Sequence, residues 1–111
     1  MRVFLDACVD PRVASLFLEH QVTTAFDAGW HQLRDHKLLP LIQEQFDAFV
    51  TIDGGFEHEH NLRKLSFGIV IVHVARNKVE FYYALRSELL DAVARVKPGE
   101  VVHVRADKPL P

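Results

Sequence analysis

Residues 69–74 read Ile-Val-Ile-Val-His-Val, a nearly continuous run of β-branched side chains. Such a run is typical of a strand buried on both faces, as strands are in a parallel sheet. Four further apolar segments with strand character lie on either side of it, at residues 2–5, 22–26, 49–52 and 101–104. The chain therefore predicts five strands, of which residues 69–74 form the fourth.

Segments with helical features separate these strands. Asp10 and Pro11 fit the start of a helix over residues 11–19, with Leu18 facing the sheet. Asp35 opens a second helix, 56–65 is a short helix or ordered loop, and 78–96 carries an apolar stripe that includes Phe81. Crossover helices between apolar strands predict an α/β fold, a three-layer α/β/α sandwich with a mainly parallel five-stranded sheet.

Length and composition restrict the class of protein. The 111 residues are enough for one domain, residues 1–111, and 13 basic against 15 acidic side chains give a net charge of -2 without a broad basic surface. The single cysteine, Cys8, forms no internal disulfide and suits a reducing compartment. No leader or membrane span is visible, so we expect a cytoplasmic protein with no membrane attachment.

Acidic residues follow two of the predicted strands. Asp6 ends the first strand, Asp53 ends the third, and Asp35 starts a helix. Ligands of open α/β sheets bind outside the carboxyl ends of the strands, so these carboxylates are candidates for one site, although Asp35 is also explained as a helix cap. Converging carboxylates favour a hard cation, Mg²⁺ or Mn²⁺, which can activate water against a phosphodiester.

Two stretches around these aspartates resemble a known family. Residues 3–11, Val-Phe-Leu-Asp-Ala-Cys-Val-Asp-Pro, look like the opening of small PIN-like domain proteins of the toxin–antitoxin type, the PIN/Mut7-C-like family. Residues 49–56, Phe-Val-Thr-Ile-Asp-Gly-Gly-Phe, resemble the second signature of that family, Thr-x-Asp-x-(Asp/Asn). The helix start at 35–39, the strand at 69–74 and the segment 97–102 follow in the expected order, so the resemblance covers essentially the whole chain.

The resemblance implies a PIN-like fold and a Mg²⁺- or Mn²⁺-dependent ribonuclease, the toxin component of a toxin–antitoxin system. Asp6, Asp53 and Asp35 would be its catalytic residues and metal ligands, RNA its substrate, and an antitoxin protein and a homodimer its partners. The chain departs from the family pattern at Ala7, where many relatives have Glu, and at Gly55, where many have Asp or Asn. These departures leave open a non-catalytic PIN-like binding or regulatory module.

Residues of other kinds complete the candidate site. Three basic residues could hold phosphates beside the acidic edge: Arg12, Arg34 and Lys37. We add Asn61, in the polar segment after Asp53, as a fourth candidate for substrate binding. The basic residues are also explained as charged surface side chains that keep the domain soluble. His73 and His103 fall on predicted strands, and we expect them to be hydrogen-bonded at the periphery of the sheet.

A receiver-like phosphoacceptor domain is a third hypothesis. Asp53 after the third strand, Asp6 after the first and the dipeptide Lys108-Pro109 fit its pattern. The first strand lacks the paired acidic residues of a receiver, and Ala75 stands where a hydroxyl should follow the fourth strand. This hypothesis is therefore less favoured than the nuclease.

Overall fold

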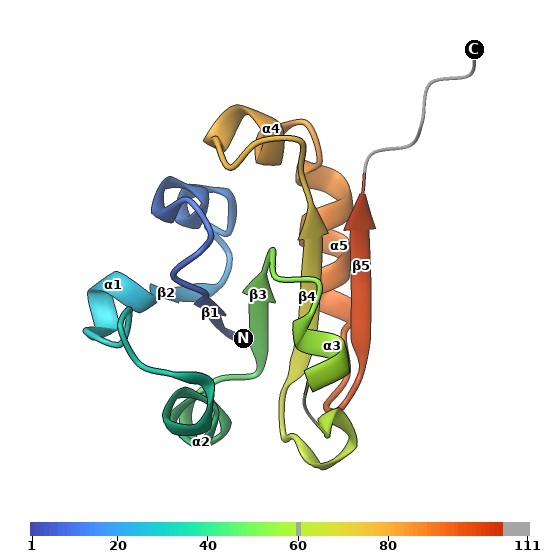
Figure 1. The fold of residues 1–111 in the computed structure, drawn as a ribbon. Coiled ribbons are helices and arrows are strands. Elements are labelled where there is room, and N and C mark those ends of the chain that lie inside the picture. The colour runs from blue at the N-terminus through green and yellow to red at the C-terminus, as the bar shows by residue number, and fades with distance from the viewer. Residues whose placement is uncertain (60, 106–111) are drawn as a thin grey trace.

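The computed structural model describes residues 1–59 and 61–105. Within this part of the chain the strands are β1 (Arg2–Leu5), β2 (Gln21–Thr24), β3 (Ala48–Thr51), β4 (Gly68–His73) and β5 (Val101–Arg105). They form one sheet in the order β2-β1-β3-β4-β5, and every neighbouring pair is parallel (Figure 1). The predicted α/β fold with a parallel five-stranded sheet is confirmed.

Helices join successive strands. The α-helices are α1 (Ala25–Ala28), α2 (Asp35–Gln45), α3 (Phe56–Glu59), α4 (Val79–Tyr83) and α5 (Arg86–Arg95), and the 3-10 helices are η1 (Pro11–Leu16) and η2 (Leu62–Lys64). In the described ranges none of them is both long and apolar enough to cross a membrane.

The sheet separates two apolar cores, because successive side chains of a strand point to opposite faces. On the face that we call the α5 face, Val3 and Leu5 pack in a cluster with side chains of η1, α4 and α5. On the opposite α2 face, Phe4 packs in a second cluster with Leu38 and Ile42 of α2 and residues of α1 and α3. This arrangement gives the predicted three layers.

The centre of the α2-face core is aromatic. Phe4 is fully buried, and its ring centroid lies 5.7 Å from that of Trp30, 5.2 Å from Phe46 and 5.9 Å from Phe49. Phe56, the first residue of α3, is also buried and lies 5.1 Å from Phe49. Trp30 therefore covers the sheet, and Phe56 anchors the short α3 to β3.

Several predicted boundaries are wrong. Residues 25 and 26 were expected to continue the second strand, but they belong to α1, because the Thr24 side chain caps that helix by accepting from the backbone N–H of Asp27 at 3.0 Å. The helix predicted to reach residue 19 ends at Leu16 as a 3-10 helix. Leu18 consequently does not face the sheet and is 87% exposed.

The long helix predicted over residues 78–96 is broken into α4 and α5. Leu85 has φ -106° and ψ 16°, outside the helical region, and forms the junction between them. Leu85 and Leu89, two residues of the predicted apolar stripe, lie in the core, whereas Phe81 of the same stripe is 36% exposed. The apolar stripe was therefore read correctly for α5 and incorrectly for α4.

Candidate functional site

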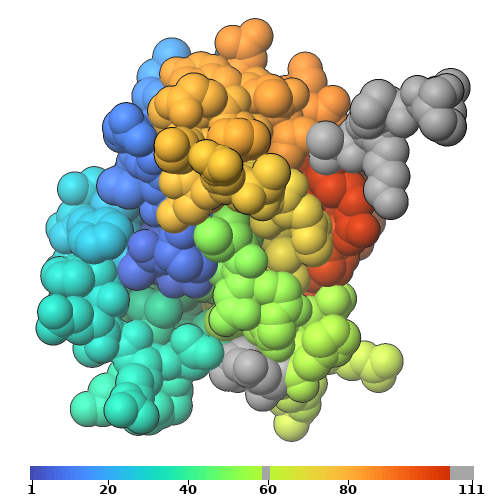
Figure 2. Space-filling model, turned by 45° about the horizontal axis from the view of Figure 1, so that its top comes forward, coloured from blue at the N-terminus to red at the C-terminus, as the bar shows by residue number. Residues whose placement is uncertain are grey.

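Asp6 and Asp53 lie at the carboxyl ends of neighbouring strands. Strands β1 and β3 pair in parallel with Leu5 opposite Val50, and the Asp6 backbone N–H continues the ladder by donating to the Val50 carbonyl at 2.9 Å. Asp6 is thereby placed beside Thr51, the last residue of β3, and Asp53 follows two residues later. Figure 2 shows the turn after β3 (green) between the segments that follow β1 (blue) and β4 (yellow).

The Asp6 carboxylate is held by donors on both oxygens. Oδ1 accepts from the backbone N–H of Ala7 at 2.8 Å. Oδ2 accepts from the Thr51 hydroxyl at 2.7 Å and from the Cys8 thiol at 3.3 Å. Asp6 is half-buried and Thr51 is fully buried, so water competes little for the hydroxyl. Hydrogen bonds to an ionised acceptor are short and strong, and these fix the orientation of the carboxylate.

Thr51 connects the two aspartates. Because its single hydroxyl proton is donated to Asp6, the Thr51 oxygen acts as acceptor for its other contacts. It accepts from the backbone N–H of Asp53 at 3.1 Å and lies 3.4 Å from Cys8 Sγ. Burial, followed by the negative charge of Asp6, raises the pKa of the Cys8 thiol. Cys8 is therefore a protonated donor in this cluster and is not an activated nucleophile.

Asp53 is more open than Asp6. Asp53 is exposed, and its Oδ1 accepts a hydrogen bond from the backbone N–H of Gly55 at 3.0 Å, which closes a turn. The Asp53 carbonyl accepts from the Phe56 N–H at 3.2 Å as α3 begins. One side chain of the candidate pair is thus fixed by three donors and the other is left accessible.

Asp35 is the first residue of α2 and is half-buried. The cap position belongs to Arg34, whose side chain makes no capping hydrogen bond, so Asp35 stabilises the first turn through its charge. Among residues 1–59 and 61–105, no group of three or more His, Cys, Asp and Glu side chains is placed to hold one metal ion. Asp6, Asp35 and Asp53 are therefore not gathered into a three-carboxylate site.

The donor set is nevertheless compatible with Mg²⁺ or Mn²⁺. Mg²⁺ is commonly bound by one or two carboxylates, with waters and substrate phosphates completing the octahedron. A carboxylate has about four lone-pair positions, and Asp6 Oδ1 accepts one hydrogen bond among the described contacts. Asp6 and the exposed Asp53 thus offer oxygen donors of the kind that these ions take.

The predicted substrate-binding residues lie in different surroundings. The Arg12 guanidinium is paired with Asp10 at 2.7 Å and, together with its backbone N–H, lowers the pKa of that carboxyl group. Arg34 and Lys37 line a shallow cavity of about 490 Å³ at the start of α2. Asn61 is exposed immediately before η2. Lys108 and Pro109, which the receiver hypothesis used, lie outside the described residues.

Asn77 secures the loop that follows Asp6, and sequence reasoning missed it. Its Nδ2 donates to the Cys8 carbonyl at 2.7 Å, and its Oδ1 accepts from the Asp10 N–H at 2.9 Å and from the Tyr82 hydroxyl at 2.6 Å. Tyr82 is fully buried, and this burial, with the nearby Cys8, raises its pKa to about 12. The only signal in the sequence is an Asn before a helix, which is common in loops.

Comparisons of the chain with protein-family models, with curated proteins and with solved structures give no match.

Proposed function

We propose that this protein is a Mg²⁺- or Mn²⁺-dependent ribonuclease of the PIN-like type. The observation that carries the proposal is the Asp6 carboxylate, held by Thr51, Cys8 and the Ala7 N–H at the carboxyl edge of the sheet. Fixing a half-buried charge in this way is useful where a cation or a reacting group must be met in one geometry. Asp53 stands at the same edge on the neighbouring strand.

In this proposal Asp6 and Asp53 hold the cation, and Asp35, at the start of α2, is not a third ligand, because no group of three acidic side chains is gathered in the described ranges. The cation, when bound, supplies an activated water and stabilises the charge that develops on the phosphodiester. Thr51 keeps Asp6 in its rotamer by donating to Oδ2, and it keeps the Asp53 backbone in place by accepting its N–H.

Positive and polar side chains would position the RNA. Arg34 and Lys37, which line one cavity, are suited to backbone phosphates, and Arg12 would extend the contact surface. Asn61 precedes η2, whose backbone lies against Gly99 before the start of β5, so it stands at the opposite end of the sheet from the aspartates and is left out of this surface. An antitoxin partner and a homodimer are proposed only on the resemblance to the PIN-like family.

The test is metal-dependent cleavage of RNA by the purified chain. We expect products from single-stranded RNA with Mn²⁺ or Mg²⁺, none with EDTA, and loss of cleavage in Asp53→Asn and Asp6→Asn. Asp91→Asn is the matched control, because Asp91 is an exposed carboxylate on α5 whose partner is Arg95 at 2.7 Å. Circular dichroism confirms that each variant is folded.

The second candidate function is a non-catalytic PIN-like binding module. It is favoured by Ala7 and Gly55, which replace two oxygen ligands of the family pattern, and by the lack of a three-acid group in the described ranges. Intact RNA over a range of substrates, with no binding of Mn²⁺ by calorimetry, would refute the nuclease and support the module.

A further inference from the structure

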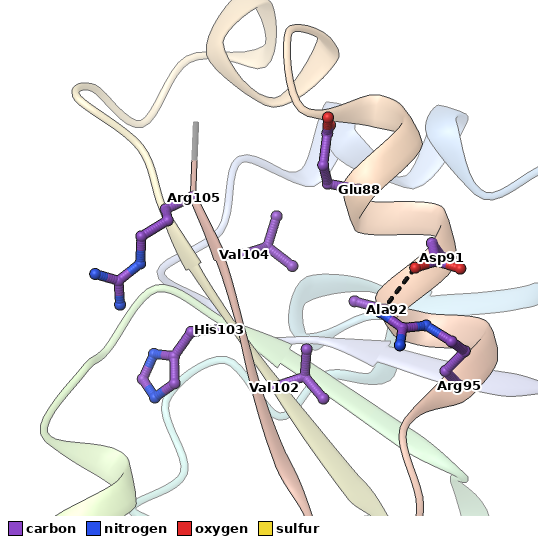
Figure 3. Close-up of a pocket in the computed structure, with 8 residues that line it drawn as sticks. All are labelled: Glu88, Asp91, Ala92, Arg95, Val102, His103, Val104 and Arg105. Atoms are coloured by element: carbon purple, nitrogen blue, oxygen red, sulfur yellow. Dashed lines mark ion pairs between the residues drawn. The ribbon is translucent and has the colours of Figure 1, made fainter. Parts of the chain in front are cut away.

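Two histidines face each other on the neighbouring strands β4 and β5. His73 Nε2 on β4 lies 2.8 Å from His103 Nδ1 on β5, and the two rings stack with centroids 5.1 Å apart. The expectation that both histidines are hydrogen-bonded at the periphery of the sheet is thus confirmed. Figure 3 shows His103 and Arg105 on the side of β5 that points away from α5, opposite Val102 and Val104.

The contacts around the pair indicate which nitrogen accepts. Arg105 Nη2 is 3.3 Å from His73 Nε2, and a guanidinium can only donate, so this nitrogen of His73 accepts, as the nitrogen of a neutral imidazole does. The 2.8 Å contact from His103 Nδ1 reaches the same nitrogen. On its other side, His103 Nε2 lies 3.0 Å from Glu57 Oε1 on α3.

The surroundings of His73 favour that neutral form. Burial, followed by the positive charges of Arg105 and His103, lowers the pKa of the His73 imidazole. A neutral imidazole is the form that binds metal ions.

We propose that His73 and His103 form a two-histidine site for a divalent first-row transition metal such as Zn²⁺ or Ni²⁺, with Glu57 orienting His103. Imidazole nitrogens suit these ions. The Glu57–His103 contact is the carboxylate–histidine arrangement found behind many metal-bound histidines. Both ligands stand on paired strands, so their backbones are already in place.

Metal binding requires the two rings to move. Two Zn–N bonds of about 2.0–2.1 Å at a tetrahedral angle place the nitrogens about 3.3 Å apart. The present separation is 2.8 Å and the nitrogens point at each other in a hydrogen bond, so the rings would have to separate and turn until both lone pairs meet at the metal. On binding, two nitrogen–metal bonds would form, the proton of the His73–His103 hydrogen bond would go to solvent, and Glu57 would stay beside His103 Nε2. Because the described residues supply no three-ligand group, waters fill the remaining positions and the site is open.

Arg105 opposes the metal. Its guanidinium donates to the same His73 nitrogen that the metal would use, and it places a positive charge beside it. Removing Arg105 should therefore strengthen metal binding, whereas removing Glu57 should weaken it. These opposite signs distinguish this site from random binding by other surface histidines.

The experiment is calorimetric titration of the full chain, without a histidine tag, with Zn²⁺ alone. We expect one Zn²⁺ per chain, loss of this binding in both His73→Gln and His103→Gln, an affinity about tenfold lower in Glu57→Gln, and a higher affinity in Arg105→Gln. His31→Gln is the control, because His31 is exposed and stacks on Phe26 instead. Mg²⁺ should give no signal at this pair, since it prefers oxygen ligands.

Unchanged Zn²⁺ affinity in either His73→Gln or His103→Gln would overturn the proposal. If a variant fails to fold, imidazole resonances of the wild-type chain decide the matter, because Zn²⁺ must shift those of His73 and His103 first. Shifts confined to other histidines would equally contradict it. Neither outcome depends on RNA cleavage, so the site is tested independently of the proposed nuclease.

Discussion

Replacing Thr51 by valine should lower the free energy of unfolding by more than the loss of a buried hydroxyl normally does. Valine is β-branched like threonine, so the substitution keeps the shape of the side chain and removes the hydrogen bonds of its hydroxyl. The change deletes the donor to Asp6 Oδ2 at 2.7 Å and the acceptor for the Asp53 N–H at 3.1 Å. A hydrogen bond to a charged group contributes about 1.5–3 kcal/mol and a neutral one about 1 kcal/mol. Because Asp6 is half-buried and Asp53 is exposed, water can replace part of these hydrogen bonds in the variant. We therefore expect the free energy of unfolding to fall by about 2 kcal/mol.

The free energy of unfolding in urea, followed by circular dichroism, measures this loss. Thr24→Val is the matched control: Thr24 is also buried, at 3% exposure, and among the described contacts its hydroxyl accepts one hydrogen bond, from the Asp27 N–H at the start of α1. Losing that helix cap should cost about 1 kcal/mol. A double-mutant cycle of Thr51→Val with Asp6→Asn then isolates the energy of the Thr51–Asp6 pair.

Two results would refute the reasoning. One is a Thr51→Val loss no larger than that of Thr24→Val. The other is a coupling energy between Thr51 and Asp6 below about 0.5 kcal/mol, the level at which independent sites already differ. In either case the hydroxyl does not hold the Asp6 carboxylate, and the proposed nuclease loses its main structural support.

Tyr82→Phe should cost about 1 kcal/mol near neutral pH, because it removes the 2.6 Å bond to Asn77. The Tyr82 pKa of about 12 exceeds the value of 10.0 in the unfolded chain, so wild-type stability should fall as pH rises from 10 to 12, and the variant should show a shallower fall in urea unfolding across that range. Gly68→Ala should destabilise by about 2–3 kcal/mol, since a Cβ there would lie 2.5 Å from Val96 Cγ2. Gly54→Ala, with nothing within 4 Å, should change the unfolding free energy by less than about 0.5 kcal/mol; equal losses at the two glycines would contradict this account.

The sequence was sufficient for the sheet because its central strands are apolar and buried. Residues 69–74 predicted β4, which is buried except at His73, and all residues of β3 are buried. Boundaries failed where a single local contact decides them. The Thr24 hydroxyl turns two β-prone residues into α1, and the backbone of Leu85 ends α4 inside an otherwise helical pattern. Neither the Thr24 hydrogen bond nor the backbone conformation of Leu85 changes the hydrophobic periodicity from which the elements were predicted.

The candidate site was predictable only in part. Asp6 and Asp53 follow from the rule that parallel strands present their carboxyl ends at one edge. Thr51 and Asn77 do not, because their roles depend on partners far away in the chain: 45 residues separate Thr51 from Asp6, and 69 separate Asn77 from Cys8. A hydroxyl at a strand end gives no sign in the sequence of which carboxylate it will meet.

The aspartate edge and the histidine pair are joined by one short segment. Asp53 begins the turn into α3, and Glu57, four residues later, contacts His103. Between them the buried Phe56 is the core anchor of the segment, packed 5.1 Å from Phe49. Because Phe56 lies between Asp53 and Glu57 in the sequence, the core contact that holds the turn also holds the carboxylate that meets His103. The packing of Phe56 therefore positions a residue of each candidate site.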